Sequence, residues 1–246
     1  MIKSLFIANW KMHKTNPATT QFVRALKQIF LPADQVVVIC PPYTALPIMQ
    51  QELTGSTIVY GAQNMHWANE GAYTGEISPE MLQALGCSYV IIGHSERRRD
   101  YNETDETVQR KVAAALHHGL VPIVCVGESL DERNHDETMA VIQRQVSIAC
   151  HGLLPTDVAR LVFAYEPIWA IGSGQAATPE YAATVHTLIR QLTRPEVTII
   201  YGGSVNADNI GQFMQQPSIQ GALIGGASVE VESFQQLLAG STINRI

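Results

Sequence analysis

Short apolar segments alternate along the chain with longer segments that have helical periodicity. Eight apolar segments rich in β-branched residues are predicted strands, at residues 5–8, 36–39, 57–60, 89–92, 121–126, 161–164, 197–200 and 222–224. Between them, apolar residues recur at helical spacing, as in Phe22, Leu26 and Ile29, and line one face of a predicted helix. This repeated order of strand and helix predicts a parallel sheet covered by helices.

Helix boundaries in the sequence agree with this pattern. A capping side chain stands before a proline at three expected helix starts, Asn16-Pro17, Ser78-Pro79 and Thr178-Pro179. Gly86 and Gly119 are expected just after helix ends, because glycine adopts the left-handed conformation that closes many helices. Eight strand–helix units favour one α/β domain over residues 1–246, a (β/α)₈ barrel of eight parallel strands ringed by helices.

An open doubly wound sheet has the same alternation of strands and helices, so the pattern alone does not exclude it. The Gly-x-Gly-x-x-Gly motif of dinucleotide-binding sheets is missing after the first predicted strand. This absence argues against a dinucleotide-binding protein.

Polar or glycine-rich clusters follow the C-terminal ends of most predicted strands, where a (β/α)₈ barrel places its active site. They are Asn9-Trp10-Lys11, Gly93-His94-Ser95-Glu96-Arg97, Tyr165-Glu166-Pro167, Tyr201-Gly202-Gly203-Ser204 and Gly225-Gly226-Ala227-Ser228. Each residue taken singly has an alternative explanation. Lys11 is then a solvated surface charge, His94 is a hydrogen-bonded structural histidine, and Glu166 caps the next turn. Their convergence on one barrel mouth favours a functional site.

The two glycine-rich clusters indicate a phosphate site, because glycine lets backbone N–H groups surround an oxyanion. They follow the seventh and eighth predicted strands, whose loops often bind phosphate in barrels, although two tight turns are the alternative. After Glu166, the apolar residues 168–171 lie between Pro167 and Gly172. We interpret them as a hinged lid that excludes water, with permanent packing into the domain as the alternative.

Composition narrows the class of protein further. The formal charge of −6 argues against a nucleic-acid binder, which needs a basic face to neutralise phosphates. The four cysteines, Cys40, Cys87, Cys125 and Cys150, form no C-x-x-C pair, so we expect free thiols rather than disulfides or a zinc site. The apolar run near the N-terminus is too short for a signal peptide or membrane span, and we expect a cytoplasmic protein without membrane contact.

Five motifs resemble the signatures of the triosephosphate isomerase family, in family order from the first strand to the last. They are Asn9-Trp10-Lys11-Met12, Gly93-His94-Ser95-Glu96-Arg97-Arg98, Ala164-Tyr165-Glu166-Pro167-Ile168-Trp169-Ala170-Ile171-Gly172, Tyr201-Gly202-Gly203-Ser204-Val205 and Gly225-Gly226-Ala227-Ser228. The resemblance implies a homodimer, without metal or cofactor, that interconverts dihydroxyacetone phosphate and glyceraldehyde 3-phosphate in glycolysis and gluconeogenesis. The chain departs from the commonest family pattern at Ser173-Gly174-Gln175, where Thr-Gly-Lys is usual.

The resemblance also implies roles for matching residues. Glu166 is the base, His94 the electrophile, Lys11 with Asn9 binds and polarises the substrate, and Glu96 supports the site. Backbone groups at Gly172, Ser204, Gly225 and Gly226 would hold the phosphate. Independently, moving a proton between adjacent carbons through an enediolate needs one base and donors aimed at the developing oxyanions. Cys125 is interpreted as a small core residue, and His117 and His118 as helix-terminating residues.

Residues 63–78 form the longest loop expected from the sequence, and we expect it to build the dimer. Trp67 and Tyr73 within it are suitable interface anchors. By the family resemblance, Thr74 reaches the partner subunit near the active site, and Glu76 pairs with Arg97 of the partner subunit. A self-packed Ω-loop is the alternative.

Two other functions have different requirements. An aldolase on the same barrel needs a Schiff-base lysine or several metal ligands at the strand ends. The five lysines, Lys3, Lys11, Lys14, Lys27 and Lys111, do not offer this convincingly. A non-catalytic phosphosugar-binding barrel is the second alternative, and the presence of both Glu166 and His94 argues against it.

Overall fold

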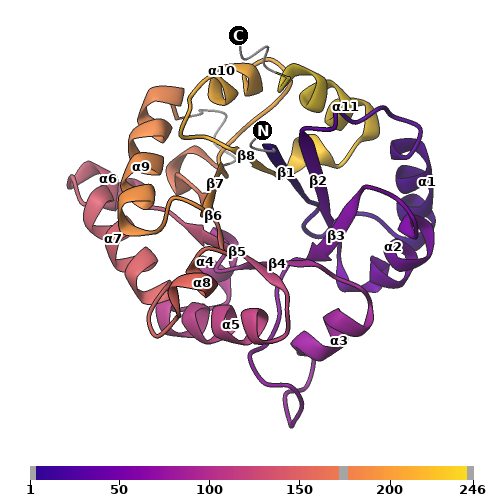
Figure 1. The fold of residues 1–246 in the computed structure, drawn as a ribbon, viewed down its shortest axis with the longest axis horizontal. Helices are drawn as coiled ribbons and strands as arrows, with labels where there is room; N and C mark the ends of the chain where they lie inside the picture. The colour runs from indigo at the N-terminus through magenta and orange to yellow at the C-terminus, as the bar shows by residue number, and fades with distance from the viewer. Residues whose placement is uncertain (1–3, 172–176, 243–246) are drawn as a thin grey trace.

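The computed structural model describes residues 4–171 and 177–242, and these form a closed barrel of eight parallel strands (Figure 1). In chain order the strands are β1(Ser4–Asn9), β2(Gln35–Cys40), β3(Val59–Ala62), β4(Tyr89–Ile92), β5(Val121–Val126), β6(Val162–Tyr165), β7(Thr198–Tyr201) and β8(Gly221–Ile224). Each strand pairs with its neighbours in sequence, and β8 pairs with β1 through Leu5 opposite Gly221. The predicted barrel is therefore confirmed, and the open sheet is excluded.

Gly221 makes this closure possible at the seam. Its φ of 150° lies in a region that side chains rarely adopt. A Cβ atom built on it would lie 1.8 Å from the backbone oxygen of Leu5. Only glycine therefore lets the eighth strand approach the first closely enough to pair.

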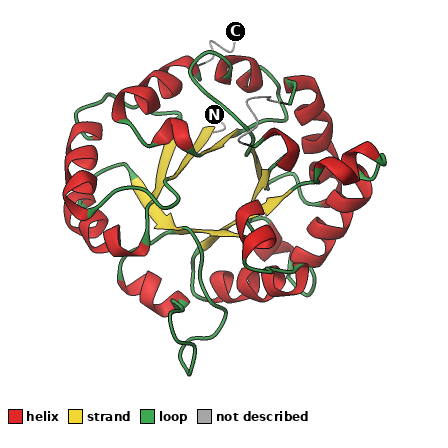
Figure 2. Cartoon of the chain, turned by 180° about the vertical axis from the view of Figure 1, so that it is seen from behind, coloured by secondary structure: helices red, strands yellow, loops and turns green. Residues whose placement is uncertain are grey.

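Helices surround the strands on all sides, as the ring of helices around the central strands in Figure 2 shows. The α-helices are α1(Asn16–Leu26), α2(Leu46–Leu53), α3(Pro79–Ala84), α4(Ser95–Asp100), α5(Asp105–His117), α6(Leu130–Asn134), α7(Thr138–Ala149), α8(Pro155–Val158), α9(Pro179–Leu192), α10(Ile210–Met214) and α11(Val231–Gly240). Three short 3₁₀ helices are η1(Tyr43–Ala45), η2(Ile168–Ala170) and η3(Gly226–Ser228). In the described part of the chain, no helix is long and apolar enough to cross a membrane.

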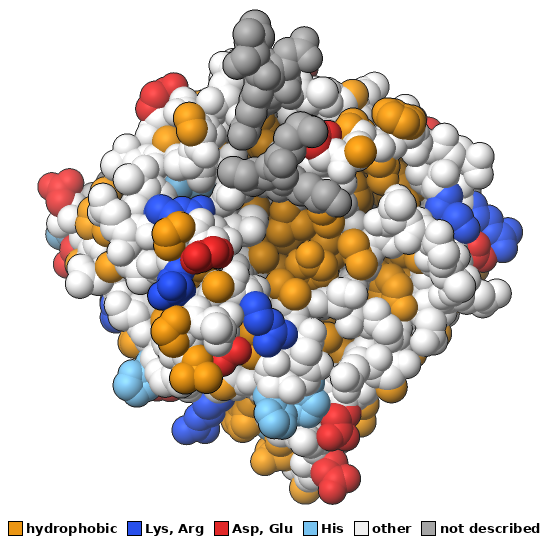
Figure 3. All heavy atoms as spheres, in the orientation of Figure 1, with side chains coloured by type: hydrophobic (Ala, Val, Ile, Leu, Met, Phe, Trp, Pro, Cys, Tyr) orange, Lys and Arg blue, Asp and Glu red, His pale blue; other side chains and the backbone are white. Residues whose placement is uncertain are grey.

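Alternate residues of each strand face two different cores, because successive side chains point to opposite faces of a sheet. One cluster includes Leu5, Ile7, Val38 and Ile91 and fills the barrel. The larger cluster contains intervening residues such as Phe6 and packs the strands against the helices. Figure 3 shows hydrophobic side chains gathered at the centre of the face that it draws. Strands buried on both faces explain why their sequences are apolar throughout.

Strand positions agree closely with the sequence pattern in five cases, and three strands start later than predicted. The fourth and fifth strands have the predicted bounds, whereas β3 begins at Val59 rather than at residue 57. Ile58 donates its backbone N–H to Ser56 Oγ at 3.1 Å, outside the ladder. The strands β6 and β7 begin one residue late because Leu161 and Val197 donate their N–H groups to preceding turns, at 3.1 Å each.

Two of the three predicted helix caps are confirmed. Ser78 and Thr178 accept backbone N–H groups of Met81 and Tyr181. Asn16 is not a cap, because Thr15 occupies that position and Asn16 is the first helical residue. Pro17 fits the second helical position equally well, since its missing N–H has no partner there. Gly86 and Gly119 have φ values of 76° and 74° after their helices, as predicted.

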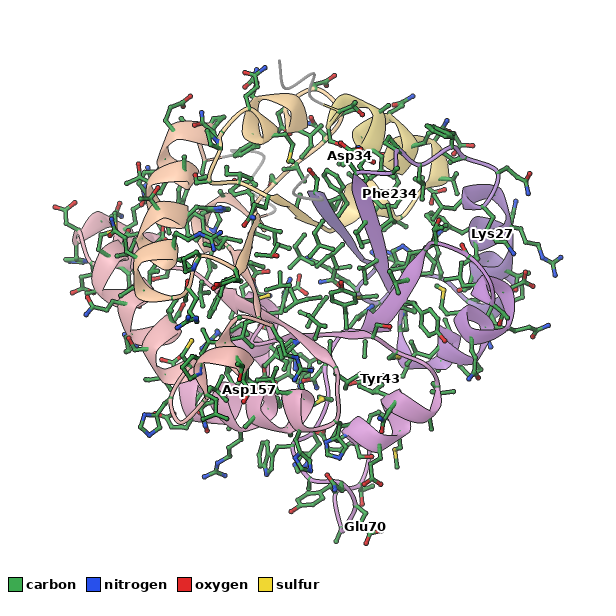
Figure 4. All side chains as sticks on the ribbon, in the orientation of Figure 1. Lys27, Asp34, Tyr43, Glu70, Asp157 and Phe234 are labelled. Carbon is green, nitrogen blue, oxygen red and sulfur yellow. The ribbon has the colours of Figure 1, made fainter. Side chains whose placement is uncertain are left out.

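The long loop after β3 projects from the barrel and is visible at the bottom of Figure 1, with Glu70 labelled at its tip in Figure 4. The base of the loop packs on itself. The His66 ring lies 4.2 Å from the Trp67 ring and 4.1 Å from the Tyr73 ring, measured between centroids. The His66 N–H also donates to the backbone oxygen of Ile77 at 2.8 Å. These contacts make the loop a preformed projection.

Candidate active site

A cavity of about 480 Å³ opens at the C-terminal ends of the strands. Its lining includes the expected site residues Asn9, Lys11, His94, Glu96, Glu166, Ser204, Gly225 and Gly226. They lie at or just after the C-terminal ends of β1, β4, β6, β7 and β8, which the closed barrel brings together. Gly172, the remaining expected phosphate contact, lies outside the described residues.

Lys11 is held in place by its backbone and by its side chain. Its φ of 51° is unusual for a residue with a side chain and is retained only where surrounding contacts fix it. The Lys11 N–H donates to Asn9 Oδ1 at 3.1 Å, and Gln63 donates its amide to the Lys11 carbonyl at 2.9 Å. The ammonium lies 2.5 Å from Glu96 Oε1. These contacts fix the Lys11 side chain at the cavity and disfavour the alternative of a freely solvated surface charge.

His94 stands immediately before α4 and is oriented by that helix. Its Nδ1 accepts the backbone N–H of Glu96 at 3.2 Å. A nitrogen that accepts a hydrogen bond carries no proton, so the ring proton of the neutral imidazole is on Nε2. That nitrogen lies 3.1 Å from Glu166 Oε1. The imidazole therefore presents a single N–H donor on the side of the carboxylate.

Glu166 follows β6 and is 2% exposed. Its Oε2 accepts the backbone N–H of Ser95 at 2.9 Å, whereas Oε1 makes no hydrogen bond within the described chain. Two glycines provide the space that Glu166 occupies. A Cβ atom at Gly127 would lie 1.7 Å from the Glu166 carbonyl oxygen, and one at Gly202 would lie 2.8 Å from Glu166 Cγ. Glu166 Oε1 is thus buried at the cavity without an aligned hydrogen bond from the described residues, 3.1 Å from His94 Nε2.

The far side of the cavity is built from backbone. The segments 201–205 and 225–228 contain no lysine or arginine. The first N–H groups of the 3₁₀ helix at Gly226 have no partner within the helix and suit an oxyanion. A Cβ atom at Gly226 would meet nothing within 4 Å, so this backbone borders open space. These segments thus offer an anion backbone N–H groups and no cation of their own.

The segment after Glu166 is anchored by a buried carboxylate that the sequence analysis missed. Trp169 Nε1 donates to Glu128 Oε1 at 2.7 Å, and the Tyr165 hydroxyl donates to both Glu128 oxygens at 3.0 and 3.1 Å. Burial raises the pKa of Glu128, although these donors oppose the shift. The Arg133 guanidinium lies 3.5 Å from the centroid of the Trp169 ring. The described part of the expected lid is thus held over the barrel end.

Gln63 and Glu128 share one sequence feature with the expected site residues, which is a position just after a strand. Gln63 directly follows β3, and Glu128 lies two residues after β5. Both are therefore polar residues at strand ends, like the expected site residues Lys11, His94 and Glu166. Single polar residues, unlike clusters, did not stand out from ordinary loop sequence.

The expected core position of Cys125 and the position of His118 at a helix end are confirmed. Cys125 is 1% exposed and belongs to the core inside the barrel, and burial raises the pKa of its thiol well above the usual value. His118 Nδ1 lies 2.9 Å from the Ala114 carbonyl in the last turn of its helix. The described residues contain no group of three or more histidine, cysteine or acidic residues that could hold a metal.

Together the barrel and the cavity define an enzyme of the (β/α)₈ class that transfers a proton on a small anionic substrate. A family model of triosephosphate isomerase matches residues 4–241. The chain belongs to the triosephosphate isomerase family.

Individual relatives extend over nearly the whole chain. A triosephosphate isomerase of Synechocystis sp. is 50% identical over 241 residues, covering 97% of this chain and 98% of the relative. One of Picosynechococcus sp. is 49% identical, with 97% and 99% covered. One of Clostridium botulinum is 46% identical, also with 97% and 99% covered. Members of this family are aldose–ketose isomerases.

Proposed function

We propose that this chain interconverts dihydroxyacetone phosphate and D-glyceraldehyde 3-phosphate through an enediolate, with Glu166 as the base. The chain is an aldose–ketose isomerase of glycolysis and gluconeogenesis. The observation that carries the assignment to Glu166 is the position of its Oε1, which is buried at the cavity, without an aligned hydrogen bond from the described residues, 3.1 Å from the ring nitrogen of His94. The mechanism uses no metal or cofactor, and a cytoplasmic location is part of the proposal.

Glu166 removes a proton from C1 of dihydroxyacetone phosphate, and the electron pair moves into an enediolate. The His94 imidazole donates its proton to O2 and takes the hydroxyl proton from O1, and the protonated carboxyl then returns a proton to C2, which gives the aldehyde. His94 is the electrophile, donating its Nε2–H to the substrate oxygens as charge develops on them. Triosephosphate isomerases are themselves the standard case of a carboxylate base combined with a neutral histidine, so these roles follow the family.

Lys11 supplies a positive charge for the same enediolate. Asn9 and Gln63 fix its backbone, and Glu96 directs its ammonium. A Cβ atom at Gly225 would lie 3.5 Å from Lys11 Cε, so the lysine side chain crosses directly beside this loop. We infer that Lys11 bridges the reacting carbons and the phosphate, with Asn9 beside it.

The phosphate is bound in this proposal by backbone groups of Ser204, Gly225, Gly226 and Gly172. Support comes from the glycine-rich backbone that borders the cavity at Gly226. The Ser204 hydroxyl donates to the Ala170 carbonyl at 2.7 Å and so joins this loop to the segment after Glu166. A closed arrangement excludes water from the enediolate and strengthens each polar contact inside.

The active chain is a homodimer in this proposal, formed by the projecting loop of residues 63–78. A second cavity of about 530 Å³ lies beside the active site and shares Lys11 and His94 with it. Met12 and Tyr101 border this cavity and are 95% and 67% exposed. Such apolar exposure suits a loop from a second copy. Thr74 would then reach that cavity, and Glu76 would pair with Arg97 of the partner subunit.

Replacing Glu166 with Gln tests the assignment of the base. The amide keeps the size of the side chain but cannot take a proton, so we expect kcat to fall at least ~10²-fold. A coupled assay with D-glyceraldehyde 3-phosphate measures kcat and KM. Glu232→Gln, on the exposed side of α11, is the matched control and should retain wild-type turnover. Near wild-type kcat in folded Glu166→Gln would require another base.

A further inference from the structure

Arg99 occupies the border between the catalytic cavity and a neighbouring groove. It lines the 480 Å³ cavity and also an adjoining groove of about 540 Å³. Ser95 and Ile168 line both spaces as well. The position of Arg99 is therefore the rim of the active site, beside the first residue of η2.

Arg99 is one of few positive charges beside the cavity. Among the described lining residues, Lys11 and Arg99 are the two lysine or arginine side chains, and Glu96 and Glu166 are the two carboxylates. The Lys11 ammonium is already 2.5 Å from Glu96. The whole chain carries a formal charge of −6, which repels a phosphate dianion at long range. An exposed cation at the rim offsets this repulsion where the substrate arrives.

Arg99 is held by contacts that exchange easily. Its guanidinium binds Asp100 through two hydrogen bonds of 2.7 Å each, and the two side chains are 67% and 46% exposed. The carboxylates of Asp100 and Glu96 both favour its charged form and raise its pKa. Exposed ion pairs contribute little net stability, because water solvates both partners well. A phosphate can therefore replace Asp100 as the partner of this guanidinium at low cost.

We propose that Arg99 is a substrate-recruiting residue, which exchanges Asp100 for the phosphate of the arriving triose phosphate before the backbone site takes it over. Its planar fork matches two phosphate oxygens, as it now matches the two oxygens of Asp100. The role concerns association and not the proton transfer itself. It rests on the proposed isomerase function and adds a residue to it.

Recruitment has a specific kinetic signature. Triosephosphate isomerases are themselves standard examples of enzymes limited by diffusional encounter, so kcat/KM responds to steering. For Arg99→Gln we expect kcat/KM to fall about threefold to tenfold at low salt, with kcat unchanged within about twofold. The difference should shrink to under about twofold near 0.3 M salt, because the Debye length falls from about 30 Å at 0.01 M to below 8 Å. Arg99→Lys should restore most of kcat/KM at low salt.

The controls separate recruitment from a general change of charge. Arg144→Gln removes the same charge from the neighbouring groove but not from the cavity, and should leave kcat/KM and its salt dependence as in the wild type. Asp100→Asn releases Arg99 and should raise kcat/KM at low salt. An Arg99→Gln variant with wild-type kcat/KM and salt dependence would overturn the proposal while leaving the isomerase function intact. A wild-type protein without isomerase activity would instead reject the function itself.

Discussion

Glu166 illustrates how much of this site depends on residues without side chains. Gly127 and Gly202 approach its backbone and its Cγ more closely than a Cβ atom permits. The Gly202 N–H also donates to the Tyr165 carbonyl at 2.7 Å, which fixes the two loops against each other. The position of the Glu166 carboxylate is thus set by backbone contacts between the ends of β6 and β7.

Gly202→Ala tests this dependence. The added methyl group would lie 2.8 Å from Glu166 Cγ and would push the carboxylate away from the reacting carbons. We expect kcat to fall roughly 10²-fold, the usual cost of a misplacement of about 1 Å, with KM changed little. Steady-state kinetics and a thermal unfolding scan measure both effects. A variant with unchanged kcat would show that Glu166 adjusts freely and that the glycine has another purpose.

At the scale of elements, the loop of residues 63–78 performs two functions in the proposed enzyme. Its first residue, Gln63, donates to the carbonyls of Lys11 and Cys40, both at 2.9 Å, and so belongs to the active site. Its projecting part carries the stacked rings of His66, Trp67 and Tyr73. Self-packing and dimerisation are therefore compatible, because a preformed loop loses less entropy on binding.

Replacing residues 66–76 with a short turn, while keeping Gln63, tests the role of the projecting part. We expect a folded monomer with activity reduced at least about tenfold, because the strained Lys11 backbone beside the proposed interface would lose support from the partner. Sedimentation velocity and the coupled assay, at equal protein concentration, measure both properties. Either a dimer that persists without the loop or a fully active monomer would contradict this account.

For the whole molecule, the buried ionisable groups decide how stability responds to pH. His186 on α9 is fully buried, its Nδ1 lies 3.1 Å from the Ser218 carbonyl, and its ring lies 6.1 Å from the Tyr165 ring. Burial lowers its pKa from 6.5 to about 4, an effect that the Ser218 carbonyl opposes and Arg190 reinforces. The folded protein therefore keeps His186 neutral where an unfolded chain would protonate it.

Stability should consequently fall as the pH drops from about 6.5 to about 4, because the unfolded chain binds a proton at His186 before the folded chain does. Well above pH 6.5 the residue is neutral in both states and has no effect. The full loss amounts to about 3 kcal/mol, from ~1.4 kcal/mol per pKa unit. Urea unfolding at fixed protein concentration should show a shallower pH dependence for His186→Gln. His135→Gln, at an exposed site, should retain the wild-type slope, and equal slopes for all three proteins would contradict the prediction.

The sequence by itself determined the alternation of strands and helices, most of the strand positions and the clusters Asn9 to Lys11, His94 to Glu96 and Glu166 at the strand ends. These features are local, because hydrophobic period and turn chemistry act over a few residues. The resemblance of the motifs then indicated the family.

Only the tertiary structure decided the rest. Four features depend on segments that lie far apart in the chain. They are the closure of β8 on β1, the strained backbone of Lys11, the approach of Gly202 to Glu166, and the contacts of Gln63 and Glu128 at the site. One helix start also differed from the prediction, because Thr15 rather than Asn16 occupies the N-cap position. Such contacts depend on which surfaces meet after the barrel closes, and no local pattern specifies them.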